Sequence, residues 1–207
     1  MNVLNALNAL LSLNALIALN SLIALLALSA FSALLAFKKT KVKMKTLYLV
    51  RHAKSSWEEP GVSDADRPLI PNGLKKTRLI VDFLQKRETS VDLIISSPAV
   101  RAYETAKIIA AGLNYPLNKI KTDRKIYDSY YDRILDIIYG TPNEINSLMI
   151  FGHNPTITNL ANLFLHPGIE IMPTSCVVCL SFNTERWEDI PATEAIREFV
   201  VSPKMLK

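Results

Sequence analysis

The sequence predicts an α/β protein: a three-layer sandwich in which a mostly parallel central sheet lies between two layers of helices. Short apolar runs alternate along the chain with longer amphipathic stretches, and strands that alternate with helices build parallel sheets covered on both faces. The chain has 207 residues, 49% hydrophobic and 21% charged, which suffices for one domain with a sizeable core. An uncharged leading segment stands apart, so we expect the domain over residues 44–207.

The expected strands are short runs rich in β-branched and aromatic residues. "TLYLV", "VDLIIS" and "SLMIF" are the clearest of these runs, and each is followed by polar or turn residues. Strands are expected at residues 46–50, 91–96, 117–122, 147–151, 175–182 and 195–201. Between them, Ser97-Pro98 suits the start of a helix and Gly112 its end. Helices are expected at residues 74–86, 97–112 and 134–139 and in the stretch that follows residue 155.

The leading segment, residues 1–37, carries no charged side chain. From Leu7 it divides into hexads, "LNALLS", "LNALIA", "LNSLIA", "LLALSA" and "FSALLA", so Leu or Phe recurs at every third residue. A helix with this pattern is apolar on every side, which is typical of a membrane span. The alternative, which we favour, is a repeat expansion or a translated stretch upstream of a start at Met44. A secretory signal fits poorly because no basic residue precedes the apolar run.

The positive charge of the chain is local. The formal net charge is +5, and five lysines lie in the first 45 residues, which hold no acid: Lys38, Lys39, Lys41, Lys43 and Lys45. The rest of the chain is therefore formally neutral, and we expect no nucleic-acid partner. The two cysteines, Cys176 and Cys179, lie three apart in an expected strand, where they face opposite sides. They predict buried thiols rather than a metal or redox pair.

Reactive side chains follow three of the expected strands. Arg51-His52 ends the first strand, Arg101 lies in the first turns of the helix after the second, and His153 follows "SLMIF" within "GHNP". The carboxyl ends of the strands are where open α/β sheets place their sites. A neutral imidazole is a good nucleophile towards phosphorus, and arginine forks bind phosphate oxygens. The pattern therefore predicts phosphoryl transfer without a metal or another cofactor.

Four motifs carry a resemblance to a known family. "LVRHAKSSW", "DADRPLIPNG", "SSPAVRAYETA" and "IFGHNP" resemble the histidine phosphatase superfamily, whose fold is phosphoglycerate-mutase-like, and its short SixA-like branch of phosphohistidine phosphatases in particular. The resemblance implies that His52 is the nucleophile and that Arg51 and Arg101 hold the phosphoryl oxygens. It also implies that His153 completes the pocket and that Arg67 is a further phosphate-facing arginine.

The sequence does not supply an obvious general acid. Hydrolysis of an alkyl phosphoester benefits from a carboxylic acid that protonates the leaving group, and larger family members carry one on an inserted segment that this chain has little room for. The candidates considered are Asp66, Glu104, Asp128 and Asp132, and none is favoured. This absence favours phosphohistidine on a protein, or a small activated phosphomonoester, as the substrate. Lys54, just after the nucleophile, is expected at the mouth of the substrate site or in an exposed loop.

The partner expected from these observations is a phosphorylated substrate, with the chain acting as a cytoplasmic monomer. Membrane contact is expected only through residues 1–37, and it would leave the domain on the cytoplasmic side. Two other functions stay open at this point. One is a non-catalytic phosphate-binding module tethered to a membrane, and the other is a phosphoglycerate mutase.

Overall fold

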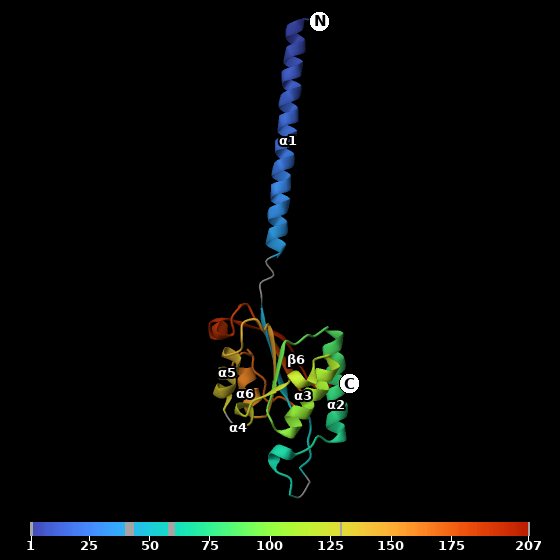
Figure 1. The fold of residues 1–207 in the computed structure, drawn as a ribbon, viewed down its shortest axis with the longest axis vertical. Helices are drawn as coiled ribbons and strands as arrows, with labels where there is room; N and C mark the ends of the chain where they lie inside the picture. The colour runs from blue at the N-terminus through green and yellow to red at the C-terminus, as the bar shows by residue number, and fades with distance from the viewer. Residues whose placement is uncertain (1, 40–43, 58–60, 129, 207) are drawn as a thin grey trace. The chain divides into compact units, whose positions relative to one another are not determined.

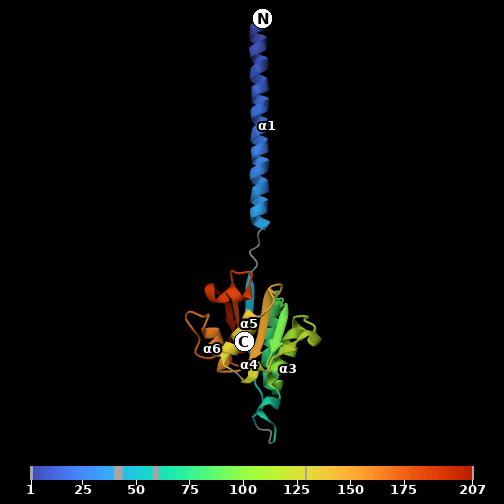
Figure 2. The same ribbon diagram turned by 60° about the vertical axis from the view of Figure 1, so that its left-hand side comes forward.

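The computed structural model describes residues 2–39, 44–57, 61–128 and 130–206. It divides into two compact units, Met1–Val42 and Lys43–Lys207, drawn in two views in Figures 1 and 2. The first unit contains the helix α1, Val3–Lys39. The second contains the sheet, the remaining helices and all the side chains expected at the site, so each unit is described by itself.

Helix α1 is apolar on all sides. Each hexad of its sequence advances the helix by about one and two-thirds turns, so the leucines spread around the whole helix instead of forming a stripe. The described side chains between residues 11 and 29 are all exposed. Within the described residues, one segment, Leu11–Ser29, is long and apolar enough to cross a membrane. Length and composition alone support this statement, and a signal sequence near an N-terminus meets the same criterion.

The second unit is built on one six-stranded sheet with the strand order β3-β2-β4-β1-β5-β6. The strands are β1 (Lys45–Arg51), β2 (Leu93–Ser96), β3 (Lys121–Thr122), β4 (Ser147–Gly152), β5 (Val177–Phe182) and β6 (Ala195–Val201). Strands β3, β2, β4 and β1 are parallel, and β5 and β6 add two antiparallel pairings at one edge. The prediction of a mostly parallel sheet is confirmed.

Helices cover both faces of this sheet. The α-helices of the second unit are α2 (Pro71–Lys86), α3 (Val100–Gly112), α4 (Lys125–Asp128), α5 (Tyr131–Tyr139) and α6 (Thr156–Asn162). Helices α2 and α3 pack on one face and α4, α5 and α6 on the other (Figure 1). Short 3-10 helices complete the fold: η1 (Asp64–Asp66), η2 (Leu117–Lys119), η3 (Trp187–Ala192) and η4 (Pro203–Leu206). The result is the predicted three-layer sandwich.

The alternation of side chains along the strands accounts for the two halves of the core. Cys176 packs in the cluster beneath α5 and α6, and Cys179 packs in the cluster beneath α2 and α3. Both are buried free thiols, as predicted. Burial raises the pKa of each to about 12, which keeps them protonated and unreactive at neutral pH.

Several boundaries differ from the expected ones. Of the strand expected at residues 117–122, only Lys121–Thr122 is a strand, because Leu117–Lys119 forms the 3-10 helix η2. Strands β2 and β5 begin two residues later than expected. Helix α3 begins at Val100 rather than at residue 97, because Ala99 is not helical (φ −58, ψ 134), and α5 begins at Tyr131 rather than at residue 134.

Helix α2 begins at Pro71 rather than at residue 74, because Ile70 is extended (φ −88, ψ 157) and a proline is tolerated in the first turn. Lys45, one residue before the expected strand, belongs to β1 and is fully buried. Its Nζ donates to the carbonyl oxygens of Asn143 and Ile145, so it forms part of the domain.

Candidate active site

The candidate site lies where β1, β4 and β2 end side by side. In the register of the sheet Arg51 pairs with Gly152, and the backbone N–H of His52 donates to the carbonyl oxygen of Gly152 at 3.1 Å. His52 and His153 therefore leave neighbouring strands at the same level, and their ring centroids are 5.0 Å apart. Parallel pairing of two sequence-distant strands thus places the two histidines next to each other.

A cavity of about 530 Å³ opens at this edge of the sheet. Its lining contains all six residues singled out in the sequence, together with five others. The lining residues are Arg51, His52, Lys54, Ser55, Trp57, Asp64, Arg67, Arg101, His153, Asn154 and Thr174. The structure thus gathers the predicted residues around one space large enough for a small ligand group.

His52 is held in one tautomer by the backbone. Its Nδ1 lies 2.7 Å from the carbonyl oxygen of Ala53, and because a carbonyl oxygen only accepts, Nδ1 carries the proton. Burial, with a contribution from Arg101 and the other arginines, lowers the pKa of His52 to about 4. The ring is therefore neutral at pH 7, and its Nε2 carries a free lone pair.

His153 is also neutral. Burial is the main cause that lowers its pKa to about 3, and the neighbouring His52 and Arg101 lower it further. Its Nε2 lies 2.8 Å from the hydroxyl oxygen of Ser97, the residue that follows β2. Tyr127 packs edge-on against the ring, with centroids 5.5 Å apart. The imidazole is fixed in position by these contacts.

The arginines of the cavity are buried or half-buried and keep unused donors. Arg51 donates from Nη1 to the carbonyl oxygen of Met172 at 2.7 Å, and Arg101 is 5% exposed. Three buried nitrogen atoms in the described part of the chain have no hydrogen-bond partner: Arg51 Nε, Arg101 Nε and His153 Nδ1. All three belong to lining residues of this cavity, and a buried donor without an acceptor is costly.

Arg67 lies in the wall of the cavity, fixed by the protein. It donates from Nε to the carbonyl oxygen of Ser56 at 2.6 Å and from Nη2 to the hydroxyl of Ser55 at 3.0 Å. Its guanidinium stacks on Trp57, 3.2 Å from the ring centroid, and Trp57 itself is 80% exposed. The loop after His52 thus presents an exposed aromatic side chain, and Lys54 is exposed beside the cavity.

Asp64 is the acid that the sequence reasoning missed. Its carboxylate accepts from Arg67 Nη1 and Arg101 Nη2, both at 2.8 Å, and from the hydroxyl of Tyr127 at 2.9 Å. Its carbonyl oxygen also accepts from Arg101 Nη1. The bond from Arg67 is the main cause that holds the pKa of Asp64 well below its ordinary value. Asp64 is therefore ionised, and in this arrangement it is not a proton donor.

The four acids considered in the sequence lie elsewhere, as far as their side chains are described. Glu104 pairs with Lys107 at 2.7 Å, and Asp66 accepts from the hydroxyl of Ser63 at 2.6 Å. Asp132 is exposed in the first turn of α5. The side chain of Asp128 falls outside the described part of the structure.

A close contact of α2 holds the loop that carries the nucleophile candidate. Gly73 is buried, and a Cβ at this position would lie 2.3 Å from the carbonyl oxygen of Lys54. The same carbonyl accepts from the backbone N–H of Ile70 at 3.1 Å. The start of α2 therefore packs directly on the backbone that follows His52, and only glycine fits there without a shift.

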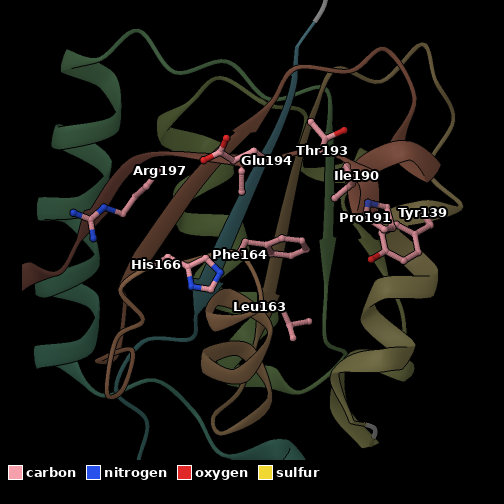
Figure 3. Close-up of a pocket in the computed structure, with 10 residues that line it drawn as sticks. Tyr139, Leu163, Phe164, His166, Ile190, Pro191, Thr193, Glu194 and Arg197 are labelled. Atoms are coloured by element: carbon pink, nitrogen blue, oxygen red, sulfur yellow. The ribbon is translucent and has the colours of Figure 1, made fainter.

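A second cavity, of about 460 Å³, lies between the end of α5, the segment after α6, η3 and β6 (Figure 3). It is lined by Tyr139, Leu163, Phe164, His166, Ile190, Pro191, Thr193, Glu194, Ala195 and Arg197. In Figure 3 the guanidinium of Arg197 extends away from Phe164. His166, the third histidine of the chain, lies here, away from the other two.

Comparison with known proteins agrees with this geometry. A model of the histidine phosphatase superfamily (branch 1) matches residues 47–133. An uncharacterized protein of Mycobacterium tuberculosis (strain ATCC 25618 / H37Rv) is 30% identical over 112 residues, which are 54% of this chain and 67% of that protein. The putative phosphoserine phosphatase 2 of Hydrogenobacter thermophilus is 47% identical over 70 residues, 32% of this chain and 33% of that protein. The crystal structure of the putative phosphohistidine phosphatase SixA from Agrobacterium tumefaciens superimposes with a TM-score of 0.65 and 26% identity, over 77% of this chain and 98% of that one.

Proposed function

This chain belongs to the histidine phosphatase superfamily, in its SixA-like branch, and is a phosphatase, and we propose that it works through a phosphohistidine intermediate on His52. The observation that carries the proposal is the tautomer of His52. Its Nδ1 is committed to the carbonyl oxygen of Ala53, so Nε2 is the nitrogen with a free lone pair. A fixed, neutral imidazole at a cationic cavity is suited to attack phosphorus.

The reaction has two steps. The lone pair of His52 Nε2 forms a bond to phosphorus as the bond from phosphorus to the leaving atom breaks. Water then cleaves the N–P bond, which releases inorganic phosphate and returns the neutral imidazole. Charge on the transferred group is spread over its three outer oxygens in such transfers, so the cavity needs several fixed donors around one point.

The proposed donors are Arg51, Arg101 and His153, with Arg67 as a further cation in the cavity wall. Arg51 Nε, Arg101 Nε and His153 Nδ1 are buried without a partner in the described structure, and phosphoryl oxygens are the acceptors that we assign to them. Fixed donors aimed at developing charge are a large term in such catalysis. Because arginines supply the positive charge, excess EDTA is expected to leave turnover intact.

The preferred substrate class follows from the leaving group. Asp64 is ionised, and the other described candidate acids are held away from the cavity by their own contacts or lie exposed on a helix. A substrate whose leaving group takes its proton from solvent therefore fits better than an alkyl ester. We propose phosphohistidine on a protein as the first choice and a small phosphomonoester as the second. The similarity to a putative phosphoserine phosphatase supports the small phosphomonoester as the second choice.

A side-by-side assay tests the substrate class. Hydrolysis of a phosphohistidine protein, an aryl phosphate, phosphoserine and sugar phosphates is compared at equal concentration, with and without excess EDTA. We expect the highest kcat/KM on phosphohistidine, a lower value on the aryl phosphate and the lowest on the alkyl esters. A preference for phosphoserine or a sugar phosphate would overturn the substrate class. Transfer between phosphoglycerates would instead identify a mutase, and phosphate binding without turnover a binding module.

We also propose that the catalytic domain begins near Met44 and is cytoplasmic, with residues 1–43 as a separate segment. Lys38 and Lys39 are the last two residues of the apolar helix α1, and basic residues favour the cytoplasmic side of a membrane. Mass spectrometry of the N-terminus of the natural protein, combined with membrane fractionation, separates the two readings of the segment. A start at Met44 identifies a translated extension, and a full-length chain that stays with membranes in high salt identifies an anchor.

A further inference from the structure

Ser97 connects the end of β2 to the site through His153. The three strands β2, β4 and β1 are neighbours, and Ser97, His153 and His52 follow them in that order across the sheet edge. Ser97 is fully buried, and its backbone N–H donates to the carbonyl oxygen of Phe151 at 2.9 Å. Its hydroxyl oxygen lies 2.8 Å from His153 Nε2. The serine is therefore fixed against the histidine by the sheet itself.

The hydrogen bonds of this hydroxyl indicate which partner is the donor. Ser97 Oγ accepts from the backbone N–H of Ala99 at 3.3 Å. A hydroxyl has one hydrogen to give, and among the described residues His153 Nε2 is the acceptor found for it. If Ser97 donates, Nε2 of the neutral ring is the unprotonated nitrogen and the ring proton resides on Nδ1.

The opposite tautomer leaves more groups unsatisfied. With the proton on Nε2, the hydroxyl of Ser97 would accept twice, its own hydrogen would lack an acceptor, and the lone pair of His153 Nδ1 would be buried without a donor. With the proton on Nδ1, one buried group remains unpaired, and that group is a donor. Unpaired buried polar groups are costly, so the second arrangement is favoured.

We propose that Ser97 is a positioning residue that fixes His153 as the Nδ1–H tautomer, so that His153 offers a donor to an oxygen of the phosphoryl group. The consequence for catalysis rests on the proposed function, whereas the tautomer itself does not. Both histidines of the site would then carry their proton on Nδ1, with opposite uses. His52 donates its Nδ1–H to the carbonyl oxygen of Ala53 and attacks phosphorus with Nε2. His153 accepts at Nε2 from the hydroxyl of Ser97 and donates from Nδ1.

The tautomer is measurable in the resting protein. The chain has three histidines, so long-range ¹H–¹⁵N correlation spectra of the ring atoms contain three patterns. The variants His153→Gln and His166→Gln assign them by the loss of one pattern each. At pH 7 we expect His153 to show a protonated Nδ1 and an unprotonated Nε2. A wild-type spectrum with the proton on Nε2 would overturn the inference whatever the activity.

A serine variant tests the cause. Ser97→Ala removes the donor, so His153 is expected to populate the Nε2–H tautomer and kcat/KM to fall about tenfold, the size of one neutral hydrogen bond. Ser181→Ala is the matched control: Ser181 is also a buried serine, 3% exposed, and its hydroxyl donates to Glu198 on β6, away from the site. This control is expected to leave both readouts unchanged.

The remaining outcomes separate the inference from the proposed function. An unchanged His153 tautomer in Ser97→Ala would show that the serine does not set it and would overturn the role of Ser97. A changed tautomer with unchanged kcat/KM would overturn the donor role of His153 in phosphoryl transfer. If His52→Ala loses activity while His153 keeps its Nδ1–H tautomer, the result supports both the nucleophile role of His52 and the assigned tautomer of His153.

Discussion

Two of the cavities in the catalytic unit are similar in size and different in chemistry. One is about 530 Å³ and the other about 460 Å³. The first collects side chains from the ends of three neighbouring strands, and its lining includes three arginines and two histidines. The second lies between helices and the edge strand β6, and its described lining has one arginine, one histidine and mainly apolar contacts. Volume alone therefore does not identify a site in this fold.

The chemical difference between the two cavities follows from the position of each cavity on the sheet. Parallel strands deliver the residues that follow them to a common edge, so the side chains after β1 and β4 converge without further help. In the second cavity Glu194 and Arg197 are exposed at the edge of the sheet, free to turn to solvent. The unpaired buried donors found in the described structure all belong to the first cavity. The following predictions test that contrast.

The largest effect is expected from His52→Ala. Removal of the nucleophile should reduce kcat by about 10³-fold or more, as loss of a nucleophile does in other covalent enzymes. Steady-state hydrolysis of an aryl phosphate measures it, with circular dichroism as a control for folding. Turnover within tenfold of the wild type would show that another group attacks phosphorus.

Arg101→Ala should follow, with a fall of about 10² to 10³-fold in kcat, because it removes a buried charge that stabilises the transition state. Arg101→Lys keeps the charge but loses the fork, and should recover only part of the loss. The same kinetic assay measures both variants. Equal activity of the lysine variant and the wild type would contradict a directed hydrogen-bonding role.

The acid limit of activity provides the third test. The pKa of His52 is lowered to about 4, so the ring stays neutral as the pH falls to 5, where an ordinary imidazole would be about 97% protonated. The rate should therefore exceed that of an unperturbed histidine by about 30-fold at pH 5. The free energy of unfolding should also fall as the pH falls, because the unfolded chain binds a proton at His52 more readily than the folded protein does. The contribution of His52 to stability is complete above about pH 6.5 and is lost as the pH falls towards 4. NMR titration of the His52 ring measures the midpoint, and a value near 6.5 would contradict the account.

A smaller effect is expected from Asp64→Asn. The carboxylate occupies donors of Arg67 and Arg101 and opposes an incoming anion, whereas asparagine keeps the shape without the charge. Because the side chain of Asp64 is 49% exposed, solvent screening limits the gain, and inorganic phosphate should inhibit up to about fivefold more tightly. Asp66→Asn, on the same short helix but bonded to Ser63, is the control. Weaker inhibition by phosphate in Asp64→Asn would identify the carboxylate as a support for the arginines rather than a competitor.

The smallest effect is expected in the second cavity. Arg197→Ala removes its one lining arginine and should change kcat/KM on an aryl phosphate by less than about twofold, as surface substitutions away from a site do. A large fall in kcat/KM for a protein substrate, with no change for the aryl phosphate, would identify the second cavity as part of a docking surface. A large fall on both substrates would break the contrast between the two cavities.

Much of the fold and the centre of the site could be predicted because both depend on local patterns. The strand at residues 195–201 was placed at its observed bounds, and His52 and His153 follow strands that the hydrophobic pattern already marks. Asp64 could not be found this way, because its partners Arg101 and Tyr127 are 37 and 63 residues away. The spacing of Asp64 and Arg67, three apart, is the one sequence signal that could have indicated their ion pair. Tyr127 contacts His153 and Asp64, and that contact depends on how α4 follows β3.

The central claim is a covalent bond between phosphorus and His52 Nε2, and a rapid-quench experiment tests it most directly. The enzyme is mixed with a ³²P-labelled substrate, quenched at early times in base, digested and mapped by mass spectrometry. We expect one phosphorylated peptide containing His52, stable in base and labile in acid, and absent from His52→Ala. An acid-stable adduct, or label on a residue other than His52, would contradict the account.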